Sequence, residues 1–511
     1  MKVQMPKMRN TIPLPHFVLW MSLLTFLLFH IPFYTFVFSH HDYKSLNGMI
    51  LIISLIVLML VANAWVYYLI FFLSRYLGKF LLVLTFMLNA VAVYFVNTYA
   101  VIIDESMIGN VLNTNYEEAG SFFSIKLIVY VTLLGILPGL YIVKARIFSV
   151  PIKRFLITSS LMLLFMLVLV FANASNWLWI DKNSKRLGGL AMPWSYAVNT
   201  SLFYTHRNQK NQKEILLPDA TIKDSSKSVV ILVIGESARS QNFSLYGYSK
   251  NTNPLLSKTT NVFHFEATSC ATYTTAGVKC ILEHADTGEF HEILPNYLYR
   301  NNVDVIWRTT NWGEPPIHIK NYQDRAVLSQ KCKGKPCNYD ELLLTGLKEQ
   351  ILSSKKNKIL IVLHTSTSHG PTYNKKYPPQ CETFKPVCTS VELANCTQEA
   401  LINAYDNTII YTDYLLHKII EDLTDLKEYH SALIFVSDHG ESLGENNLYM
   451  HGLPLSIAPK EQYDIPFIVW TDGSRQLKPN KTVSQHHVFH SVLNFLDIQS
   501  PIYDEELNIF D

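Results

Sequence analysis

The residues best suited to chemistry in this sequence are acids and histidines that follow short apolar runs. Glu236 comes after VVILVI, His364 ends ILIVLH, and Asp438 and His439 follow ALIFVS. Each one alone is as easily explained by a turn or a helix cap, because polar residues after a strand commonly cap the next helix. Three runs that each deliver such a residue favour a metal site, and two carboxylates with a histidine are a suitable ligand set for zinc.

A threonine-rich loop supplies a candidate nucleophile. The segment ATSCATYTTAGVKC carries Thr268, Thr272, Thr274 and Thr275 near two cysteines that could brace it. A threonine hydroxyl is a poor nucleophile at neutral pH, but coordination to zinc lowers its pKa and the same metal polarises a phosphoryl oxygen. An exposed polar loop is the simpler interpretation of this segment by itself, so the prediction of phosphoryl chemistry depends on the metal ligands elsewhere.

The elements that must position these residues alternate between strands and helices. From residue 228 onward β-rich runs recur, with helical patterns such as EALINAYDNTIIYTDYLLHKIIEDL between them. This alternation predicts a mostly parallel sheet with helices on both faces. In such folds the functional groups lie just past the carboxyl ends of the strands, which is where Glu236, Asp438 and His439 fall.

The first third of the chain has a different composition, which predicts membrane spans. Five apolar stretches are long enough, with their flanks, to cross a bilayer: residues 17–38, 48–73, 80–103, 127–143 and 155–172. Five buried core helices in succession are a poorer explanation, and a cleaved signal peptide would account for the first stretch alone. Lys and Arg concentrate in alternate connections, which places the N-terminus in the cytoplasm and the chain after about residue 175 outside.

The chain is therefore expected to have three segments. Residues 1–175 form a transmembrane domain, residues 176–225 a connector along the membrane surface, and residues 226–511 an external catalytic domain. The formal net charge of +2 and the absence of a basic run give no sign of a nucleic-acid binder.

Cysteine usage agrees with an external domain. None of the seven cysteines lies in the membrane half, as expected where disulfides form outside the cytoplasm. Cys270 with Cys280 and Cys332 with Cys337 are natural local pairs. Of the three remaining cysteines, one must stay unpaired or bond elsewhere.

Five motifs, taken together and in order, resemble those of the phosphoethanolamine transferases of Gram-negative inner membranes, in the alkaline phosphatase/sulfatase superfamily. They are VIGESARSQNFSLYGY, SCATYTTAGVKC, HTSTSHGPTY, NAYDNTIIYTD and VSDHGESLGENNLYMHG. The resemblance covers essentially the whole chain. It implies five transmembrane helices followed by a periplasmic α/β domain of alkaline phosphatase/sulfatase type. It also favours a Cys388–Cys396 disulfide and leaves Cys381 unpaired.

At the matching positions, the resemblance implies a zinc site and a nucleophile. Glu236, Asp438 and His439 are similar to the zinc ligands of the family, and Thr274 takes the position of the nucleophilic threonine, which also binds the metal. The adjacent Thr275 is the alternative, since Ala271 and Lys279 depart from the usual residues beside the cysteines. One tightly bound zinc ion is expected, with a second as an option.

Further histidines complete the catalytic set that the resemblance implies. His369 and His451 correspond to the histidines near the substrate phosphate, and His364 to another family histidine, expected to bind substrate. Glu441 and Glu445 are interpreted as ordinary acids that open the following loop or helix.

A segment of the membrane half resembles the part of the family that holds the donor head group. In MIGNVLNTNYEEA (107–119), Asn110, Thr114 and Glu118 are spaced by four, so they would share one face of a helix. Glu118 would be a partner for the ethanolamine ammonium. A merely solvated helix face is the alternative.

The predicted activity is transfer of phosphoethanolamine from phosphatidylethanolamine, through a phosphoethanolamine-threonine intermediate, to an envelope acceptor. Lipid A or the lipooligosaccharide core is the expected acceptor, with other glycans or protein as options. Two alternatives remain open: a glycerol-phosphate transferase of the lipoteichoic acid synthase type, and a non-catalytic membrane-tethered binding protein. A sulfatase is disfavoured, because CATYT lacks the pattern that a formylglycine nucleophile requires.

Overall fold

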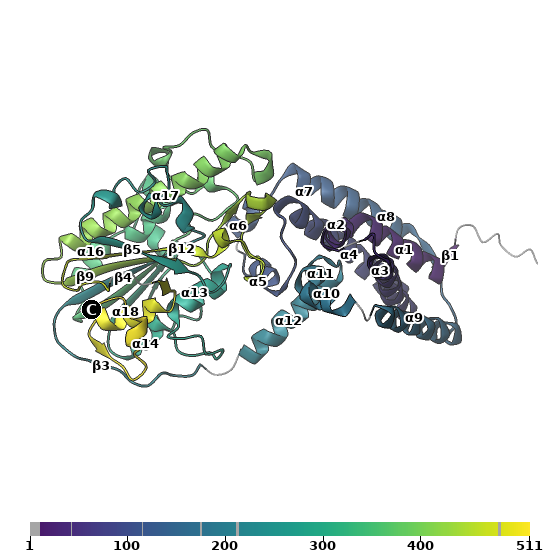
Figure 1. The fold of residues 1–511 in the computed structure, drawn as a ribbon, viewed down its shortest axis with the longest axis horizontal. Coiled ribbons are helices and arrows are strands. Elements are labelled where there is room, and N and C mark those ends of the chain that lie inside the picture. Colours follow the sequence, from purple (N-terminus) through teal and green to yellow (C-terminus); the bar gives the residue numbers. More distant parts are fainter. Residues whose placement is uncertain (1–10, 42, 115, 174–175, 211–213, 479–481) are drawn as a thin grey trace, which may run out of the picture. The chain divides into compact units, whose positions relative to one another are not determined.

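The computed structural model describes residues 11–41, 43–114, 116–173, 176–210, 214–478 and 482–511, and Figure 1 shows their fold. The chain divides into two compact units. The helical unit comprises Met1–Ile108 and Phe123–Phe203, and the sheet unit comprises Gly109–Phe122 and Tyr204–Asp511. The limits of the three expected segments stay a prediction, because compactness alone does not locate a membrane.

Among the described residues, the helical unit contains four helices that are long and apolar enough to span a membrane. They are α3 (Leu46–Leu73), α4 (Arg75–Tyr99), the stretch Ile125–Lys144 and α9 (Ile152–Ala172). α1 (Leu14–Phe29) and α2 (Ile31–His40) are bent by 64° at a break between them. Pro32 lies in the first turn of α2, and a proline cannot donate the backbone hydrogen bond that would continue α1. The five expected spans are present, by length and composition, when this bent pair counts as one.

Shorter elements complete the helical unit. The stretch Ile125–Lys144 consists of α7 (Ile125–Tyr130), the π-helical turn Val131–Ile136 and α8 (Leu137–Lys144). β1 (Thr11–Pro13) pairs in parallel with β2 (Arg146–Phe148). Three helices follow α9, namely α10 (Trp177–Lys182), α11 (Ser184–Leu190) and α12 (Trp194–Lys210).

The start of α12 pairs with polar side chains on the long helices. Trp194 donates its indole N–H to Asn63 Oδ1 of α3 at 3.0 Å, and the Tyr196 hydroxyl donates to Asn89 Oδ1 of α4 at 3.0 Å. Both asparagines are buried. These bonds satisfy amide oxygens that would be costly to leave unpaired in an apolar interior.

Two short helices stand where one helix is expected around residues 107–119. α5 (Glu105–Asn113) ends just before Thr114, whose hydroxyl donates to the Asn110 carbonyl oxygen at 2.7 Å. α6 (Tyr116–Ser121) then begins after residue 115, which lies outside the described residues. Asn110 and Thr114 therefore do not share one unbroken helix with Glu118, and the binding role of the three residues stays a prediction. The side chain of Glu118 lies outside the described residues.

The sheet unit is built on a central sheet that has eight strands among the described residues. Their order is β13-β5-β12-β9-β4-β8-β6-β7. In chain order they are β4 (Ser228–Gly235), β5 (Val262–Thr268), β6 (Asp304–Thr309), β7 (Asn321–Gln323), β8 (Lys358–His364), β9 (His430–Ser437), β12 (Asp464–Thr471) and β13 (Val483–Ser484). Only β12 runs antiparallel to its neighbours, β5 and β9. The predicted, mostly parallel sheet is confirmed.

Helices cover both faces of this sheet. Figure 1 shows α17 (Gln398–Thr424) over one face and α13 (Thr274–Leu282), α14 (Leu294–Arg300) and α18 (His487–Phe495) over the other. Alternate apolar residues of β4 pack into one core cluster with residues of the latter three helices. This is the pattern expected for strands buried on both faces.

Small elements and disulfides brace the periphery of the sheet unit. α15 (Arg325–Ser329) and α16 (Leu347–Leu352) lie between β7 and β8 in the chain, β3 (Thr221–Ile222) pairs with β14 (Ile498–Gln499), and β10 (Ser442–Leu443) pairs with β11 (Tyr449–Met450). The disulfides are Cys270–Cys280, Cys332–Cys337 and Cys388–Cys396, and Cys381 is a buried free thiol. Both local pairs and the third pairing implied by the resemblance are confirmed.

Candidate active site

Parallel pairing brings the first predicted ligands together. β4 and β9 are neighbours in the sheet, and Gly235 lies opposite Ser437. Glu236 and Asp438 therefore leave the sheet side by side, and His439 follows at once. All three side chains are almost fully buried. The carboxyl end of the sheet thus collects the acids and the histidine that sequence reasoning assigned to it.

Thr274, from a distant part of the chain, joins this cluster. Its Oγ1 lies 3.3 Å from Glu236 Oε2 and 3.3 Å from His439 Nε2. His439 Nε2 in turn lies 3.4 Å from Glu236 Oε1 and 3.4 Å from Asp438 Oδ2. Four buried side chains therefore hold one oxygen or nitrogen each within 3.5 Å of the next.

The other bonds of these residues leave unused lone pairs facing one another. His439 Nδ1 donates to the Gly440 carbonyl oxygen at 2.8 Å, so the neutral ring presents a lone pair at Nε2. Asp438 Oδ1 accepts from the backbone N–H groups of Ser237 and His439 at 3.0 and 2.7 Å. Among the described residues, Asp438 Oδ2 has no hydrogen-bond donor. These acceptors converge in a buried place, where a proton on His439 Nε2 or a metal ion in its stead supplies the balancing positive charge.

The electrostatics of the cluster lead to the same conclusion. Burial raises the pKa of Asp438, and the nearby Glu236 carboxylate raises it further, to about 7. Burial lowers the pKa of His439, but the Asp438 and Glu236 carboxylates outweigh this effect and raise it to about 10. Burial also raises the pKa of Glu236, but the bond with His439 and the charges of nearby histidines hold it well below its ordinary value. The carboxylates stabilise whatever positive charge is placed beside them.

Four of the six pairwise distances among these side chains are of the size expected for ligands of a tetrahedral metal ion. Zinc bonds to oxygen and nitrogen of about 2.0–2.1 Å imply ligands about 3.3–3.4 Å apart in a tetrahedron, and the observed contacts are 3.3 to 3.5 Å. A looser group of Glu236, His439 and His451, with ligand atoms within 4.8 Å, shares two of these residues. We favour the set with Asp438, because its Oδ2 has no other use, whereas His451 has a partner of its own.

Thr274 is the first residue of α13, and two features fix it there. The Cys270–Cys280 disulfide joins the preceding loop to the last turns of that helix. Gly277 allows α13 to approach the Asp438 loop, since a Cβ at this position would lie 2.2 Å from the Asp438 carbonyl oxygen. Thr274 therefore faces the cluster from a helix N-terminus, where unpaired backbone N–H groups favour anions.

Gln485 ties the threonine loop to the ligand loop, a role that sequence reasoning missed. Its Nε2 donates to the Asp438 carbonyl oxygen at 2.7 Å, and its Oε1 accepts the backbone N–H of Cys270 at 3.1 Å. A glutamine before a helix carries no pattern that distinguishes it from a surface residue, so no sequence signal could have identified it.

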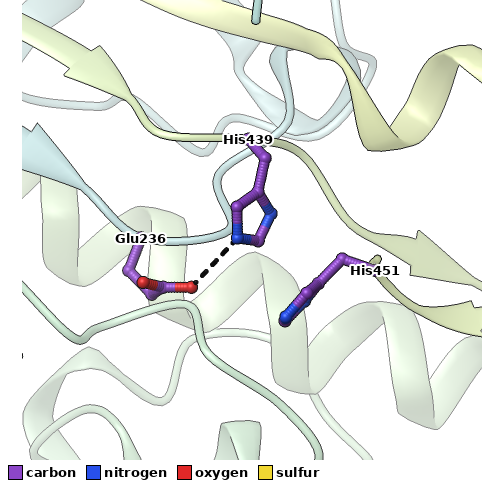
Figure 2. A group of neighbouring side chains, drawn as sticks. All are labelled: Glu236, His439 and His451. Carbon is purple, nitrogen blue, oxygen red and sulfur yellow. Dashed lines mark ion pairs between the residues drawn. The ribbon is translucent and has the colours of Figure 1, made fainter. Parts of the chain in front are cut away.

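His451 lies beside the cluster and is oriented by Glu441. The His439 and His451 ring centroids are 4.2 Å apart, and Figure 2 shows the His451 ring turned toward the space next to Glu236 and His439. His451 Nδ1 donates to Glu441 Oε2 at 2.8 Å, and the Tyr373 hydroxyl donates to the other oxygen at 2.9 Å. Glu441 is fully buried, so its interpretation as an ordinary loop acid is wrong. The β10–β11 pairing folds this part of the loop inward.

Glu445 has a supporting role. It pairs with Arg239 at 2.7 Å, and Arg239 also donates to the Glu441 carbonyl oxygen at 2.9 Å. The interpretation of Glu445 as an acid outside the reactive group agrees with this structural pairing.

His369 and His364 occupy different places. The His369 ring lies 5.4 Å from the His451 ring, and its Nδ1 donates to the Gly370 carbonyl oxygen at 2.7 Å, so both histidines border the same space. His364 is fully buried at the end of β8, with Nδ1 3.7 Å from Glu314 Oε2. Its assignment to substrate stays a prediction.

Asn311 is a further residue that sequence reasoning missed. It donates to Glu236 Oε2 at 2.6 Å and to the Thr365 carbonyl oxygen at 2.9 Å, which fixes the carboxylate in place. Asn311 follows β6 in the chain, so the rule that identified Glu236 could also have identified it. Gly313, two residues later, has φ +98°, and a Cβ there would lie 3.2 Å from Thr274 Cγ2.

The predicted donor-binding residues are only partly placed. Asn110 reaches the sheet unit, because a Cβ on Gly452 would lie 3.7 Å from Asn110 Nδ2, and Gly452 follows His451. Thr114 closes the end of α5 with its hydroxyl bonded to the backbone. Their roles toward substrate stay predictions.

Comparison with known proteins gives this geometry a context. A family model described as phosphoethanolamine transferase EptA/EptB matches residues 61–208, and a sulfatase model matches residues 228–498. The chain is 39% identical to phosphoethanolamine transferase EptA of Helicobacter pylori, over 96% of this chain and 95% of the relative. The chain belongs to the phosphoethanolamine transferase family.

Two further family members support this assignment. The chain is 32% identical to the phosphatidylethanolamine transferase Mcr-1 of Escherichia coli, over 80% of this chain and 81% of the relative. The structure of the integral membrane lipooligosaccharide phosphoethanolamine transferase A of Neisseria meningitidis superposes with a TM-score of 0.87, at 26% identity, over 97% of this chain and 98% of that one. The predicted fold class is confirmed, and the chain is a membrane protein of this transferase family.

Proposed function

We propose that this membrane enzyme transfers phosphoethanolamine from phosphatidylethanolamine to a phosphate of lipid A or of a lipooligosaccharide. Membership of the family supports the transferred group, and the names of the Mcr-1 and Neisseria relatives support the donor and the acceptor class. The observation that carries the mechanism is the contact of Thr274 Oγ1 with Glu236 and His439, both at 3.3 Å.

The four-residue cluster is proposed to hold one zinc ion. Glu236, Asp438 and His439 would bind it, with Thr274 as the fourth ligand. When bound, zinc lowers the pKa of a coordinated hydroxyl and offsets negative charge on phosphoryl oxygens. The contact distances and the unpartnered Asp438 Oδ2 support a tetrahedral site. A second ion stays an option.

In the first step Thr274 Oγ1 attacks the donor phosphorus. A bond forms between Oγ1 and phosphorus, the bond from phosphorus to the diacylglycerol oxygen breaks, and the proton lost by the threonine hydroxyl ends on that leaving oxygen. The product is a phosphoethanolamine-threonine. In the second step an acceptor oxygen attacks the same phosphorus and Oγ1 leaves as the threonine hydroxyl.

Residues around Thr274 stabilise the charge that develops in both steps. The N-terminus of α13 directs backbone N–H groups at the phosphate oxygens. His369 and His451 border the same space, and Glu441 fixes the ring orientation of His451 at 2.8 Å. Burial and the nearby His439 lower the pKa of His451 despite its Glu441 partner, so the neutral ring, with Nδ1–H on Glu441, presents Nε2 as an acceptor toward this space.

The donor head group and the location of the enzyme complete the proposal. Asn110, Thr114 and Glu118 bind the ethanolamine end of the donor. The catalytic unit lies in the periplasm and the apolar helices lie in the inner membrane. The three disulfides support this location, because disulfides persist in the periplasm and are rare in the cytosol.

The test is mass spectrometry of the full chain after incubation with phosphatidylethanolamine alone. The peptide with residues 267–280 should gain one phosphoethanolamine group at Thr274. The Thr274→Ala variant should lose both the adduct and diacylglycerol release, whereas Thr275→Ala is the matched control and should retain them. Full donor turnover by Thr274→Ala would refute the assigned nucleophile, and a glycerol-phosphate adduct would identify a different donor.

A further inference from the structure

A polar cavity of about 120 Å³ lies beside the cluster, within the sheet unit. Its lining includes Asn311, Trp312, Arg325, His369 and Lys376. At about 30 Å³ per molecule in the liquid, this volume corresponds to roughly four waters. A space of this size is large enough for a compact polar group such as a phosphate.

Two lining residues place this cavity next to the reacting atoms. Asn311 bonds Glu236 Oε2 at 2.6 Å on one side and lines the cavity on the other. His369, in the same wall, lies 5.4 Å from the His451 ring. The loop that begins at Asn311 also contacts Thr274, since a Cβ at Gly313 would lie 3.2 Å from Thr274 Cγ2. A group in the cavity is therefore within reach of the threonine.

The charges of the wall favour an anion. Arg325 and Lys376 contribute cations, and the wall contains no carboxylate among the described residues that line it. Within the described part of the chain, the Arg325 guanidinium belongs to no ion pair, and the neighbouring Asp324 is occupied in capping the Val327 N–H at 2.9 Å. Guanidinium groups bind phosphate through two parallel hydrogen bonds, so Arg325 suits such a ligand.

The buried carboxylate of Asp340, behind the cavity wall, gives the cavity a preference for a hydroxyl group of the ligand. The hydroxyls of Thr310 and Ser366, which also line the cavity, donate to Asp340 Oδ1 at 2.5 and 3.1 Å. Asp340 is almost fully buried, so these protons are held by the acid and the hydroxyl lone pairs remain for a ligand. A ligand that offers a phosphate to Arg325 and a hydroxyl to this side matches both walls. A sugar phosphate has both groups.

We propose that this cavity binds the phosphate of the acceptor, a sugar phosphate on an envelope glycolipid, through Arg325 and Lys376. The inference deepens the proposed function and rests on it. An oxygen of the acceptor phosphate monoanion forms the new bond to the phosphorus held on Thr274. The bond from that phosphorus to Thr274 Oγ1 breaks, and the proton lost by the acceptor ends on Oγ1. The product is a diphosphate.

The experiment separates the two halves of the reaction in the full chain purified in detergent. Diacylglycerol release from phosphatidylethanolamine without acceptor measures the first half. Transfer to lipid A measures the second half. For Arg325→Ala, we expect unchanged diacylglycerol release and a KM for lipid A raised about 30-fold or more, as for removal of one partner of a buried charge pair. Arg325→Lys should restore part of the loss. Glucose 1-phosphate should inhibit transfer by the natural sequence competitively, and far less in Arg325→Ala.

The control variant is Lys331→Ala, which removes one positive charge from an exposed residue outside the cavity wall. It should leave both halves unchanged. Slower diacylglycerol release in Arg325→Ala would overturn the inference, because the cavity would then bind the donor. An unchanged KM for lipid A would overturn it as well. If the natural sequence releases no diacylglycerol at all, the proposed function itself fails, which is a distinguishable result.

Discussion

The two ends of the central sheet both bury charged residues, but they balance the charge differently. At the amino end of β8, the fully buried Lys358 ammonium donates to Asp224 Oδ1 at 2.7 Å, Asp497 Oδ2 at 3.3 Å, and the hydroxyls of Ser226 and Ser228. At the carboxyl end, Glu236, Asp438 and His439 face one another with acceptor atoms. The amino end is balanced by a lysine ammonium, whereas the carboxyl end gathers its acceptors around a histidine whose proton a metal ion can replace.

The comparison of the two clusters shows which properties distinguish a structural group of charged residues from a functional one. The side chains at the carboxyl end are at most 1% exposed, whereas Asp224 and Asp497 at the amino end are 50% and 21% exposed. The two ends also differ in their hydrogen bonding. The Lys358 ammonium has more acceptors than protons, whereas Asp438 Oδ2 has no hydrogen-bond donor among the described residues. A buried polar atom that lacks a hydrogen-bond partner marks a place where a ligand can bind.

Removing the metal should produce the largest effect and should act on the carboxyl end alone. Dialysis of the full chain against a strong chelator should lower transfer by roughly 1,000-fold or more, because the zinc-dependent activation of Thr274 is lost. It should also lower the melting temperature, since zinc binds the folded state. Readdition of zinc should restore both. Full activity after chelation would contradict the assignment of the cluster.

Blocking the close contact between α13 and the Asp438 loop should have the next largest effect. Gly277→Ala places a Cβ 2.2 Å from the Asp438 carbonyl oxygen, so either α13 or the ligand loop must move. A displacement of about 1 Å can cost roughly 100-fold in rate, measured as kcat for transfer. Gly188→Ala in α11 is the matched control, because a Cβ there meets nothing within 4 Å. Equal activity of both variants would show that Thr274 tolerates displacement.

Removing the Lys358 ammonium at the amino end of the sheet should lower stability and leave the transfer rate unchanged. Lys358→Met removes the ammonium and leaves Asp224 and Asp497 without their shared cation. Loss of one partner of a fully buried ion pair costs about 3 kcal/mol, and the loss here should be smaller because Asp224 is half exposed; it is measured by denaturant unfolding of the sheet unit in the full chain. The kcat of the folded fraction should stay unchanged. A lower kcat at full stability would mean that the two ends are coupled.

The smallest effect should appear in acid. The hydrogen bond from Lys358 holds the pKa of Asp224 at about 2, below its ordinary value of 3.8. The stability that this carboxylate contributes is therefore present above about pH 4 and is lost as the pH falls through 2. Asp224→Asn should flatten the fall of the melting temperature over this range. The change should be small because Asp224 is half exposed and solvent screens it.

Much of the carboxyl end could be predicted from sequence, because strand periodicity locates it. Glu236, Asp438 and His439 directly follow apolar runs, and in a parallel sheet such positions meet at one edge. The prediction of Thr274 depended on the family resemblance, because a threonine-rich loop has no hydrophobic periodicity from which its position can be inferred. The partition of the chain into apolar helices and a sheet unit was also visible in composition.

The residues that sequence reasoning missed are positioned by contacts distant in the chain. Glu441 is buried by the pairing of β10 with β11, and Gln485 reaches Asp438 across 47 residues. Neither contact has a local signature. The bend between α1 and α2 did have a local sequence signature, Pro32, but this residue lies inside a long apolar run that predicts one continuous span.

We propose that the buried cluster binds zinc through Asp438 rather than through His451. The most direct test is the zinc content of two purified variants, Asp438→Ala and His451→Ala, measured by elemental mass spectrometry beside the natural sequence. We expect Asp438→Ala to lose the ion and His451→Ala to retain about one per chain, since the tetrahedral spacing involves Asp438, Glu236, His439 and Thr274. Loss of zinc from His451→Ala with retention in Asp438→Ala would contradict the account.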